Sequence, residues 1–508
     1  MSAGTAPESF DVSKEQGVEK LHKNAIGLVG VLFLTVTGAA PMSAMLGNVP
    51  FGAYAGNGTY MPAAFLLATI VLTIFSIGYA AMARRISSVG GFYSFISQGL
   101  GRDIGMSAGI TSLFSYSLFE ASLYGLFAYF GNAFLKEHMG IDVPWVYLAL
   151  FCVVLASILS YFDVQISAAV LGVALILEVI MLTIFNVGVM TATSGTNFNP
   201  ESLNVFNVFS SVDVQKIGEV DIAAGAAAIG VFMAFWSWVG FEMAPNYAEE
   251  SRDPKRIIPL SLFISVMGLG LFYIWTSWCA VSAYPTTGDM LAKASKDASN
   301  FFLTPIGTFV GPWAALLMSV LILTSSFACG MAFHNTAARY LYSLGREGAL
   351  PHFLGNTHDT YKSPYVASIV QSVLAAIWIG GFAYYMGTDN PNDQAYVGVY
   401  TMLAVLGTML LLILQAIVSI AIIVYFAKHG GGGFLSTKVA PLIAFFAQAI
   451  LVYLLVDNIE TLGGSSWFVK NIPMIALGIM GLGLVWGLAL RVLSPSTHAR
   501  IGRLVYNE

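Results

Sequence analysis

Three carboxylic acids lie deep within apolar stretches of this sequence, at Glu120, Glu178 and Glu242. An ionisable side chain inside a membrane is costly, so each of these acids is a candidate functional group. Loss of water favours the neutral form of a carboxyl group, and Glu178 is therefore expected to bind and release a proton. A neutral Glu178 with a packing role is an equal alternative. Glu242 and Glu120 are expected either to face an ammonium group or to bond neighbouring backbone and hydroxyl donors, and for Glu120 the second interpretation is preferred.

Two apolar stretches are interrupted by residues that do not favour a continuous helix. The predicted substrate-binding residues at the first interruption are Gly38, Ala39, Ala40, Pro41, Met42 and Ser43. Those at the second are Phe235, Trp236, Ser237, Trp238, Gly240, Phe241 and Glu242. Non-helical backbone at membrane depth persists only where protein or a water-filled cavity covers it. Two such breaks, five spans apart, predict a substrate site between two repeats of a transporter.

The aromatic residues of the second break are suited to an ammonium group. A cation over an aromatic face gains about 0.5–2 kcal/mol. This role is favoured for Phe235 and Trp236, whereas for Trp238 and Phe241 simple packing is equally expected. At the first break, Pro41 has no N–H group, so one donor that could bind a carboxylate is missing.

The composition requires a membrane environment. The chain of 508 residues is 57% hydrophobic and 10% charged, whereas soluble domains carry roughly 25% charged residues. Residues 1–24 lack the pattern of a secretory leader. The cysteines, Cys152, Cys279 and Cys329, lie in apolar stretches and are expected to pack, not to form disulfides or a metal site. The absence of a phosphate loop, paired metal ligands or a nucleophile motif argues against an enzyme, and no cofactor, metal or nucleic-acid partner is expected.

Twelve apolar stretches are long enough to span a bilayer, which needs about 20 residues per helix. They lie near residues 25–53, 61–83, 107–134, 145–161, 166–191, 222–248, 257–284, 311–336, 365–386, 398–427, 439–457 and 472–491. With twelve spans, 17 of the 22 Lys and Arg residues fall on the side of the two termini and 5 on the other. The positive-inside rule therefore predicts that both termini are cytoplasmic, in a plasma or inner membrane.

Three motifs at the ends of these spans resemble one family. They are residues 79–94, which include Arg84-Arg85 and Gly90-Gly91, residues 240–259, and residues 338–351, which include Gly345-Arg346-Glu347-Gly348. Together they are similar to the amino acid–polyamine–organocation (APC) permeases, and the resemblance covers about residues 25–491. It implies an all-α, LeuT-like fold in which spans 1–5 and 6–10 form inverted repeats and spans 11 and 12 are peripheral.

The resemblance also implies the organisation of the chain. We expect a cytoplasmic tail (1–24), a first repeat (25–191), an extracytoplasmic loop (192–221), a second repeat (222–427), two further spans (428–492) and a cytoplasmic tail (493–508). In sodium-coupled relatives, adjacent hydroxyls of span 8 bind the ion, so Thr324, Ser325 and Ser326 form a possible sodium site, which is the minority interpretation. His334 in the same span could relay protons, although a packing role is preferred.

One departure from the family bears on the substrate. Amino-acid permeases of this family usually carry Gly-[Ser/Thr]-Gly at the first break, whereas this chain has Pro41-Met42-Ser43. This break is similar to the Pro-Met-[Ser/Thr] break of bacterial putrescine importers. We expect a secondary transporter that imports a small amine-bearing solute by proton symport and alternating access. An amino acid is ranked first on family frequency, a polyamine or monoamine importer or exchanger second, and a transporter-like nutrient sensor is the alternative of another class. The oligomeric state is not predicted.

Overall fold

The computed structural model describes residues 26–86, 90–161, 164–195, 197–210, 215–217, 220–222, 227–248, 250–361, 363–386, 394–459 and 466–502. The expected tail 1–24, residues 503–508 of the second tail, parts of the loop 192–221 and the motif residues Ser88, Val89 and Glu249 lie outside these ranges.

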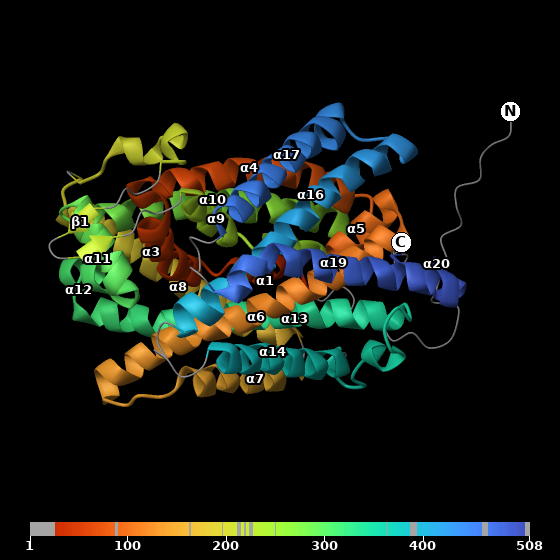
Figure 1. Cartoon of the computed structure of the whole chain (residues 1–508), viewed down its shortest axis with the longest axis horizontal. Coiled ribbons are helices and arrows are strands. Elements are labelled where there is room, and N and C mark those ends of the chain that lie inside the picture. Colours follow the sequence, from red (N-terminus) through yellow and green to blue (C-terminus); the bar gives the residue numbers. More distant parts are fainter. Residues whose placement is uncertain are drawn as a thin grey trace.

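Helices form almost all of the described chain (Figure 1). Those of the first part are α1 (Leu28–Ala39), α2 (Pro41–Ser43), η2 (Ala44–Asn48), α3 (Val49–Gly52), η3 (Ala53–Asn57), η4 (Gly58–Tyr60), α4 (Met61–Ala83), α5 (Gly91–Leu100), α6 (Arg102–Met139), α7 (Trp145–Tyr161), α8 (Val164–Ala192), η5 (Pro200–Leu203) and η6 (Val205–Asn207). Those of the second part are α9 (Ala227–Trp236), η7 (Phe241–Tyr247), α10 (Pro254–Ser282), α11 (Thr287–Lys296), η8 (Ala298–Asn300), α12 (Leu303–Phe309), α13 (Pro312–Arg346), η9 (His352–Gly355), α14 (Tyr365–Met386), η10 (Gln394–Met402), α16 (Leu403–His429), η11 (Leu435–Val439), α17 (Ala440–Asp457), α19 (Trp467–Leu493) and α20 (Pro495–Arg500).

The helices fall at all twelve of the positions expected for membrane spans. Within the described ranges, nine stretches are long and apolar enough to cross a membrane, and one of them, Leu28–Ala83, joins the first two expected spans. The third and fourth expected spans are α6, which is not among the nine, and α7, which is apolar but short. The protein is therefore a helical, multi-pass protein, and the count of twelve crossings stays a prediction.

A small β-hairpin, which the apolar pattern of the sequence does not predict, interrupts the otherwise helical architecture. Strands β1 (Gln215–Ile217) and β2 (Val220–Ile222) pair antiparallel, with Lys216 opposite Asp221. The hairpin lies at the end of the loop expected at 192–221, extends one residue beyond it, and precedes α9, which begins at Ala227.

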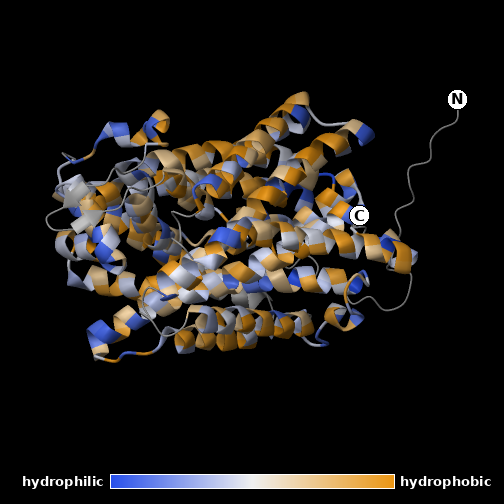
Figure 2. Cartoon of the chain, in the orientation of Figure 1, coloured by the Kyte–Doolittle hydropathy of each residue, from blue (hydrophilic) through white to orange (hydrophobic). Residues whose placement is uncertain are grey.

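The outer helices present hydrophobic side chains to their surroundings, as lipid-facing helices must. Figure 2 shows hydrophobic residues along the flanks of α7, α14 and α17. Large apolar side chains are exposed there, for example Phe151 of α7 and Phe446 of α17, each 56% exposed. Contiguous exposed apolar surface on this scale marks contact with a membrane or a partner.

The interrupted helices lie inside this shell. The α1 helix contacts α8, α10 and α13, and α2 contacts α8 and α13. The α9 helix packs on α3, η3 and α4, while η7 contacts α1 and α10. Every residue from Met233 to Tyr247 is buried. Residues 37–53 are buried as well, so the two breaks meet in the interior of the molecule.

Candidate functional site

The first break occurs at Ala40. The α1 helix ends at Ala39, and Ala40 has φ 39° and ψ 80°, a left-handed conformation that is uncommon for a residue other than glycine. Pro41 then begins α2 as its first residue. The N–H group of the first residue of a helix makes no hydrogen bond within that helix, so proline, which lacks an N–H, costs nothing there. The fixed φ of proline also suits the start of a helix. The sequence Ala40-Pro41 therefore ends one half-helix and starts the next.

The second break follows Trp236. The α9 helix ends there, a turn follows, and Gly240 adopts φ 120° before the 3₁₀ helix η7 begins at Phe241. The two breaks touch through their backbones. A Cβ atom at Gly240 would lie 2.5 Å from the carbonyl carbon of Gly38 and 2.9 Å from the nitrogen of Ala39. Glycine at position 240 therefore permits both the turn and the close approach.

Side chains from other helices satisfy the backbone groups that the first break leaves without intrahelical partners. The Met42 N–H donates to Glu178 Oε2 at 3.2 Å, and the Ser43 N–H donates to Ser325 Oγ at 3.2 Å. On the preceding half-helix, the Ala39 carbonyl accepts a hydrogen bond from Tyr273 OH at 3.0 Å. A helix N-terminus attracts negative charge, so the carboxylate of Glu178 is well placed at the start of α2.

Glu178 forms one cluster with two of the three hydroxyl residues proposed for sodium. Ser325 Oγ donates to Glu178 Oε2 at 2.8 Å, and Ser43 Oγ donates to Ser325 Oγ at 2.9 Å. Ser326 Oγ lies 3.2 Å from Ser43 Oγ. Thr324 is not part of this cluster, because its side chain is exposed and its hydroxyl bonds the Leu321 carbonyl at 2.9 Å.

Glu242 binds the backbone of its own break. Its two carboxylate oxygens accept the Gly240 N–H at 3.0 and 3.3 Å, and Tyr116 OH donates to Oε1 at 2.9 Å. Tyr79 OH adds a bond to the Glu242 carbonyl at 3.3 Å. These bonds are the ones expected for the structural alternative, in which the acid satisfies donors freed by the break, and a contact between Glu242 and the substrate stays a prediction.

A small cavity lies between the two breaks, with a volume of about 20 Å³. Its lining consists of Gly38, Ala39, Ala40, Ser43, Ala44, Asn48, Leu123, Trp236, Ser237, Val239, Cys329, Phe333 and Tyr400. A buried water requires roughly 10–15 Å³, so this conformation is closed around a space for one water-sized molecule. A larger solute requires the aromatic lining to move.

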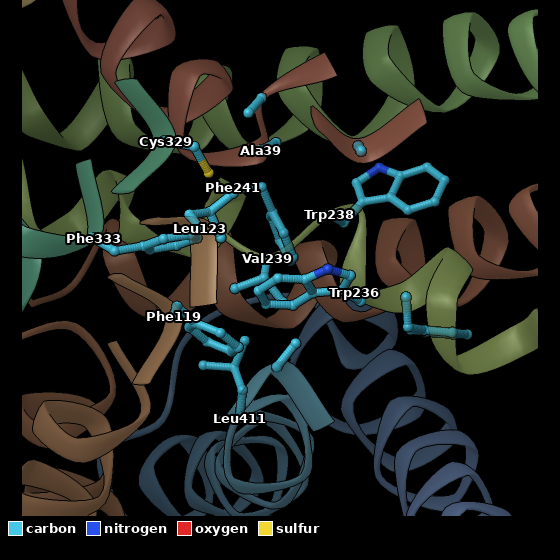
Figure 3. Packing of buried hydrophobic residues seen from close by; sticks show 14 of the residues in the cluster. Ala39, Phe119, Leu123, Trp236, Trp238, Val239, Phe241, Cys329, Phe333 and Leu411 are labelled. Carbon is cyan, nitrogen blue, oxygen red and sulfur yellow. The ribbon is translucent and has the colours of Figure 1, made fainter. Parts of the chain in front are cut away.

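A hydrogen-bonded chain fixes that lining. Trp236 Nε1 donates to Tyr400 OH at 3.0 Å, Tyr400 OH donates to Asn48 Oδ1 at 2.5 Å, and Asn48 Nδ2 donates to Ser237 Oγ at 2.8 Å. The Trp236 ring also lies 4.6 Å from the ring of Phe119, between centroids. Figure 3 shows the side chains of Trp236, Phe119 and Phe333 packed close together. Asn48 and Tyr400 are not among the residues predicted from the sequence, and only Asn48, a polar residue just after the first break, carries a local signal.

The other predicted aromatic residues do not line the cavity. Trp238 packs against Tyr273 with centroids 5.1 Å apart and donates to the Val266 carbonyl at 3.4 Å. Phe241 packs edge-on against Phe75 at 6.1 Å, and Phe235 is buried outside the lining. Pro41, Met42 and Gly240 shape the breaks without lining the cavity.

Glu120 lies in a separate buried cluster and not at the cavity. Its Oε1 is 2.9 Å from His334 Nδ1, and its Oε2 accepts a hydrogen bond from Gln371 Nε2 at 2.7 Å. His334 Nε2 is in turn 2.8 Å from Ser368 Oγ. The cluster joins α6, α13 and α14, and Glu120 and His334 are completely buried. The structure thus brings Glu120 to a histidine and an amide, away from the residues between the breaks.

Comparison with known proteins agrees with this architecture. A family model described as "Amino acid permease" matches residues 26–485. The low-affinity putrescine importer PlaP of Escherichia coli is 25% identical over 396 residues, which cover 77% of this chain and 81% of PlaP. An uncharacterized transporter of Mycobacterium tuberculosis is 24% identical over 63% of this chain and 66% of its own length. The vacuolar cationic amino acid transporter 4 of Arabidopsis thaliana is 23% identical over 77% of this chain and 63% of its own length. These relatives are named as transporters and not as enzymes, and the family match over residues 26–485 shows that this chain belongs to the amino acid permease (APC) family.

Proposed function

We propose that this protein is a secondary active transporter for a small amine and that its substrate binds between the two helix breaks. The family and the relatives support transport of amines or amino acids in general. The paired breaks in α1–α2 and α9–η7 favour a LeuT-like arrangement of two five-helix repeats with alternating access. The bias of Lys and Arg residues favours cytoplasmic termini.

The hydrogen bonds of α2 favour an amine without a carboxylate. A substrate carboxylate would be held by free amides at the start of the second half-helix. Here Pro41 has no N–H, while the amides of Met42 and Ser43 are already bonded to Glu178 and Ser325. The protein thus supplies its own carboxylate at the position where a substrate carboxylate would bind. This observation carries the proposal, and it reverses the order in which the sequence ranked amino acids and amines.

The cavity lining suits an ammonium group. The carbonyl oxygens of Gly38 and Ala39 each retain a second lone pair. Trp236 and Phe333 offer aromatic faces for cation–π contact. Tyr400 and Asn48 add oxygen atoms to the same lining. The lining holds no charged side chain, so carbonyl dipoles and aromatic rings would carry the recognition of the cation.

Glu178 is the best candidate for coupling transport to a proton. Its Oε2 accepts hydrogen bonds from Met42 of α2 and from Ser325 of α13. Protonation would remove most of the negative charge that holds both donors and would loosen α2 from α8 and α13. Proton binding would therefore change the freedom of the half-helix that forms the site. Sodium at Ser325 and Ser326 is the less favoured alternative.

The first experiment measures thermal stabilisation of the purified protein by matched pairs of ligands. Putrescine is compared with ornithine, and cadaverine with lysine, because each pair differs by one carboxylate. A ligand that binds only the folded protein stabilises it by about 2.7 kcal/mol at 100 times its dissociation constant. Greater stabilisation by the amines supports the proposal. Stabilisation by the amino acids alone would show that a substrate carboxylate replaces Glu178 and Ser325 as the hydrogen-bond partner of the Met42 and Ser43 amides, and the proposal would be wrong.

The second experiment measures uptake into proteoliposomes under an imposed pH gradient. We expect Glu178→Gln to abolish gradient-driven uptake, whereas Glu201→Gln, an exposed residue outside the helices that carry the site, leaves it unchanged. Full gradient-driven uptake by Glu178→Gln would refute the proposal that Glu178 couples transport to a proton. Uptake that disappears when sodium is replaced by choline would favour the sodium alternative, and ligand binding without any uptake would favour a sensor.

A further inference from the structure

We propose that a polar hollow at the ends of α7, α13 and α14 binds the headgroup of a phospholipid that carries a phosphate and a primary ammonium. The hollow has a volume of about 550 Å³, within the range of about 300–1,000 Å³ that is usual for ligand sites. Its polar lining includes Tyr161, Arg346, His352, Asn356, His358 and Asp359. None of these residues lines the cavity between the helix breaks, so this site is independent of the proposed substrate site.

Close packing and hydrogen bonds hold the segments that form the walls of the hollow against one another. A Cβ atom at Gly345 would lie 2.7 Å from the nitrogen of Gly355, so the segment after α13 packs directly on the end of that helix. The His358 N–H donates to the Ser363 carbonyl at 2.9 Å, and Ser363 Oγ donates to the Tyr161 carbonyl at 2.8 Å. These bonds attach the segment between α13 and α14 to the end of α7 and fix the shape of the hollow.

One lining histidine has a structural role that fixes its tautomer. His358 Nδ1 accepts hydrogen bonds from the Thr360 and Tyr361 N–H groups, each at 3.2 Å. The neutral ring therefore carries its proton on Nε2, which lies 2.9 Å from Tyr161 OH. His358 positions the wall, and among the described residues of the lining the permanent charges are Arg346 and Asp359.

These two charges are suited to a zwitterionic headgroup. The guanidinium of Arg346 lies over the ring of Tyr342, 5.0 Å from its centroid, which orients the fork of the side chain. Such a fork bonds phosphate oxygens in pairs. The exposed carboxylate of Asp359 is a partner for a primary ammonium, which has N–H donors that a quaternary ammonium lacks. The combination favours phosphatidylethanolamine over phosphatidylglycerol or phosphatidylcholine.

The surface that leads to the hollow favours a lipid over a soluble phosphate compound. The α7 and α14 helices run side by side at one edge of the molecule (Figure 1). Their large exposed apolar residues include Val154 and Ile158 of α7, and Ile369 and Val373 of α14. Ile158 and Ile369 lie within about one helical turn of the lining residues at the ends of their helices. Acyl chains that follow this apolar surface would place the headgroup in the hollow.

The test is native mass spectrometry of the full-length protein in detergent, titrated with phosphatidylethanolamine, phosphatidylglycerol or phosphatidylcholine. We expect phosphatidylethanolamine to bind most tightly. Arg346→Gln should bind it about tenfold more weakly, the loss expected for a hydrogen bond to a charged group. The matched control is Arg84→Gln, which removes an exposed arginine at the end of α4 and should change nothing.

A second variant keeps the proposal testable if Arg346→Gln does not fold. Asp359 is exposed, and Asp359→Asn should abolish the preference for phosphatidylethanolamine over phosphatidylglycerol. Inorganic phosphate is the probe for a soluble ligand. If phosphate at millimolar concentration displaces the lipid and stabilises the wild type but not Arg346→Gln, the site binds a soluble phosphate, and the lipid proposal is wrong. Equal binding of all three lipids to both variants and the wild type would also overturn it.

Discussion

The contact between the two helix breaks predicts that Gly240→Ala is far more damaging than the same substitution at Gly38 or at Gly481. Gly240 has φ 120°, a conformation that L-residues with a side chain rarely adopt. The strain of such a conformation costs about 1–3 kcal/mol. The new methyl group would also lie 2.5 Å from the Gly38 carbonyl carbon and 2.9 Å from the Ala39 nitrogen, which are backbone atoms that cannot rotate away. Overpacking adds about 1–3 kcal/mol, so the expected total is about 2–6 kcal/mol.

The assay is thermal unfolding of the purified protein followed by tryptophan fluorescence, with two matched variants. At Gly38 the nearest atom to a new Cβ is the flexible end of Met243 at 2.2 Å, and Gly240 Cα is 3.3 Å away, so Gly38→Ala should cost less. At Gly481 in α19 no atom lies within 4 Å, so Gly481→Ala should be neutral or slightly stabilising. If Gly240→Ala were as stable as Gly481→Ala, the breaks would not meet through their backbones, and the site described between them would be wrong.

Three further predictions concern regions outside the breaks. Arg339 and Glu250 form a buried ion pair at 2.7 Å, so Arg339→Gln should destabilise the protein by about 3–5 kcal/mol, whereas loss of both charges should cost less; the check is a double-mutant cycle of unfolding. Deletion of residues 501–508 exposes the site that buries Ile501, which is 1% exposed, and should lower stability by about 1.5–3 kcal/mol in the same assay. Partial burial acts to raise the pKa of Asp297, but the hydrogen bond and charge of Lys293 outweigh it and hold that pKa below its ordinary value of 3.8. The Asp297–Lys293 pair therefore stabilises the folded state above that value and should lose its effect as the pH falls below about 4, as measured by the pH dependence of unfolding with and without Asp297→Asn.

Much of the architecture follows from local properties of the sequence. A run of about 20 apolar residues forms a helix in a membrane because its backbone must bond internally. The positions of the twelve expected spans coincide with helices for this reason. The breaks are local as well, because Pro41 starts a helix and Gly240 permits a positive φ whatever surrounds them.

The partners of the three acids could not be predicted from local sequence. Each was identified as a buried carboxylate, but its partner lies far along the chain. Glu178 meets the Met42 amide, 136 residues away, and Glu120 meets His334, 214 residues away. Hydropathy indicates that an acid lies in a membrane span, but it does not indicate which helix that acid faces. The structure therefore separates Glu178, at the first break, from Glu120, which lies in another cluster.

The sequence by itself determined the family, the helical class, the two breaks and the residues that could hold charge in the membrane. Only the tertiary structure decided which of these residues share a site. The cavity is closed by Asn48 and Tyr400, which are 352 residues apart. Of the four aromatic residues at the second break, only Trp236 lines it. The physical reason is that helix formation depends on neighbours within a few residues, whereas the direction of each side chain depends on how long helices pack and rotate against one another.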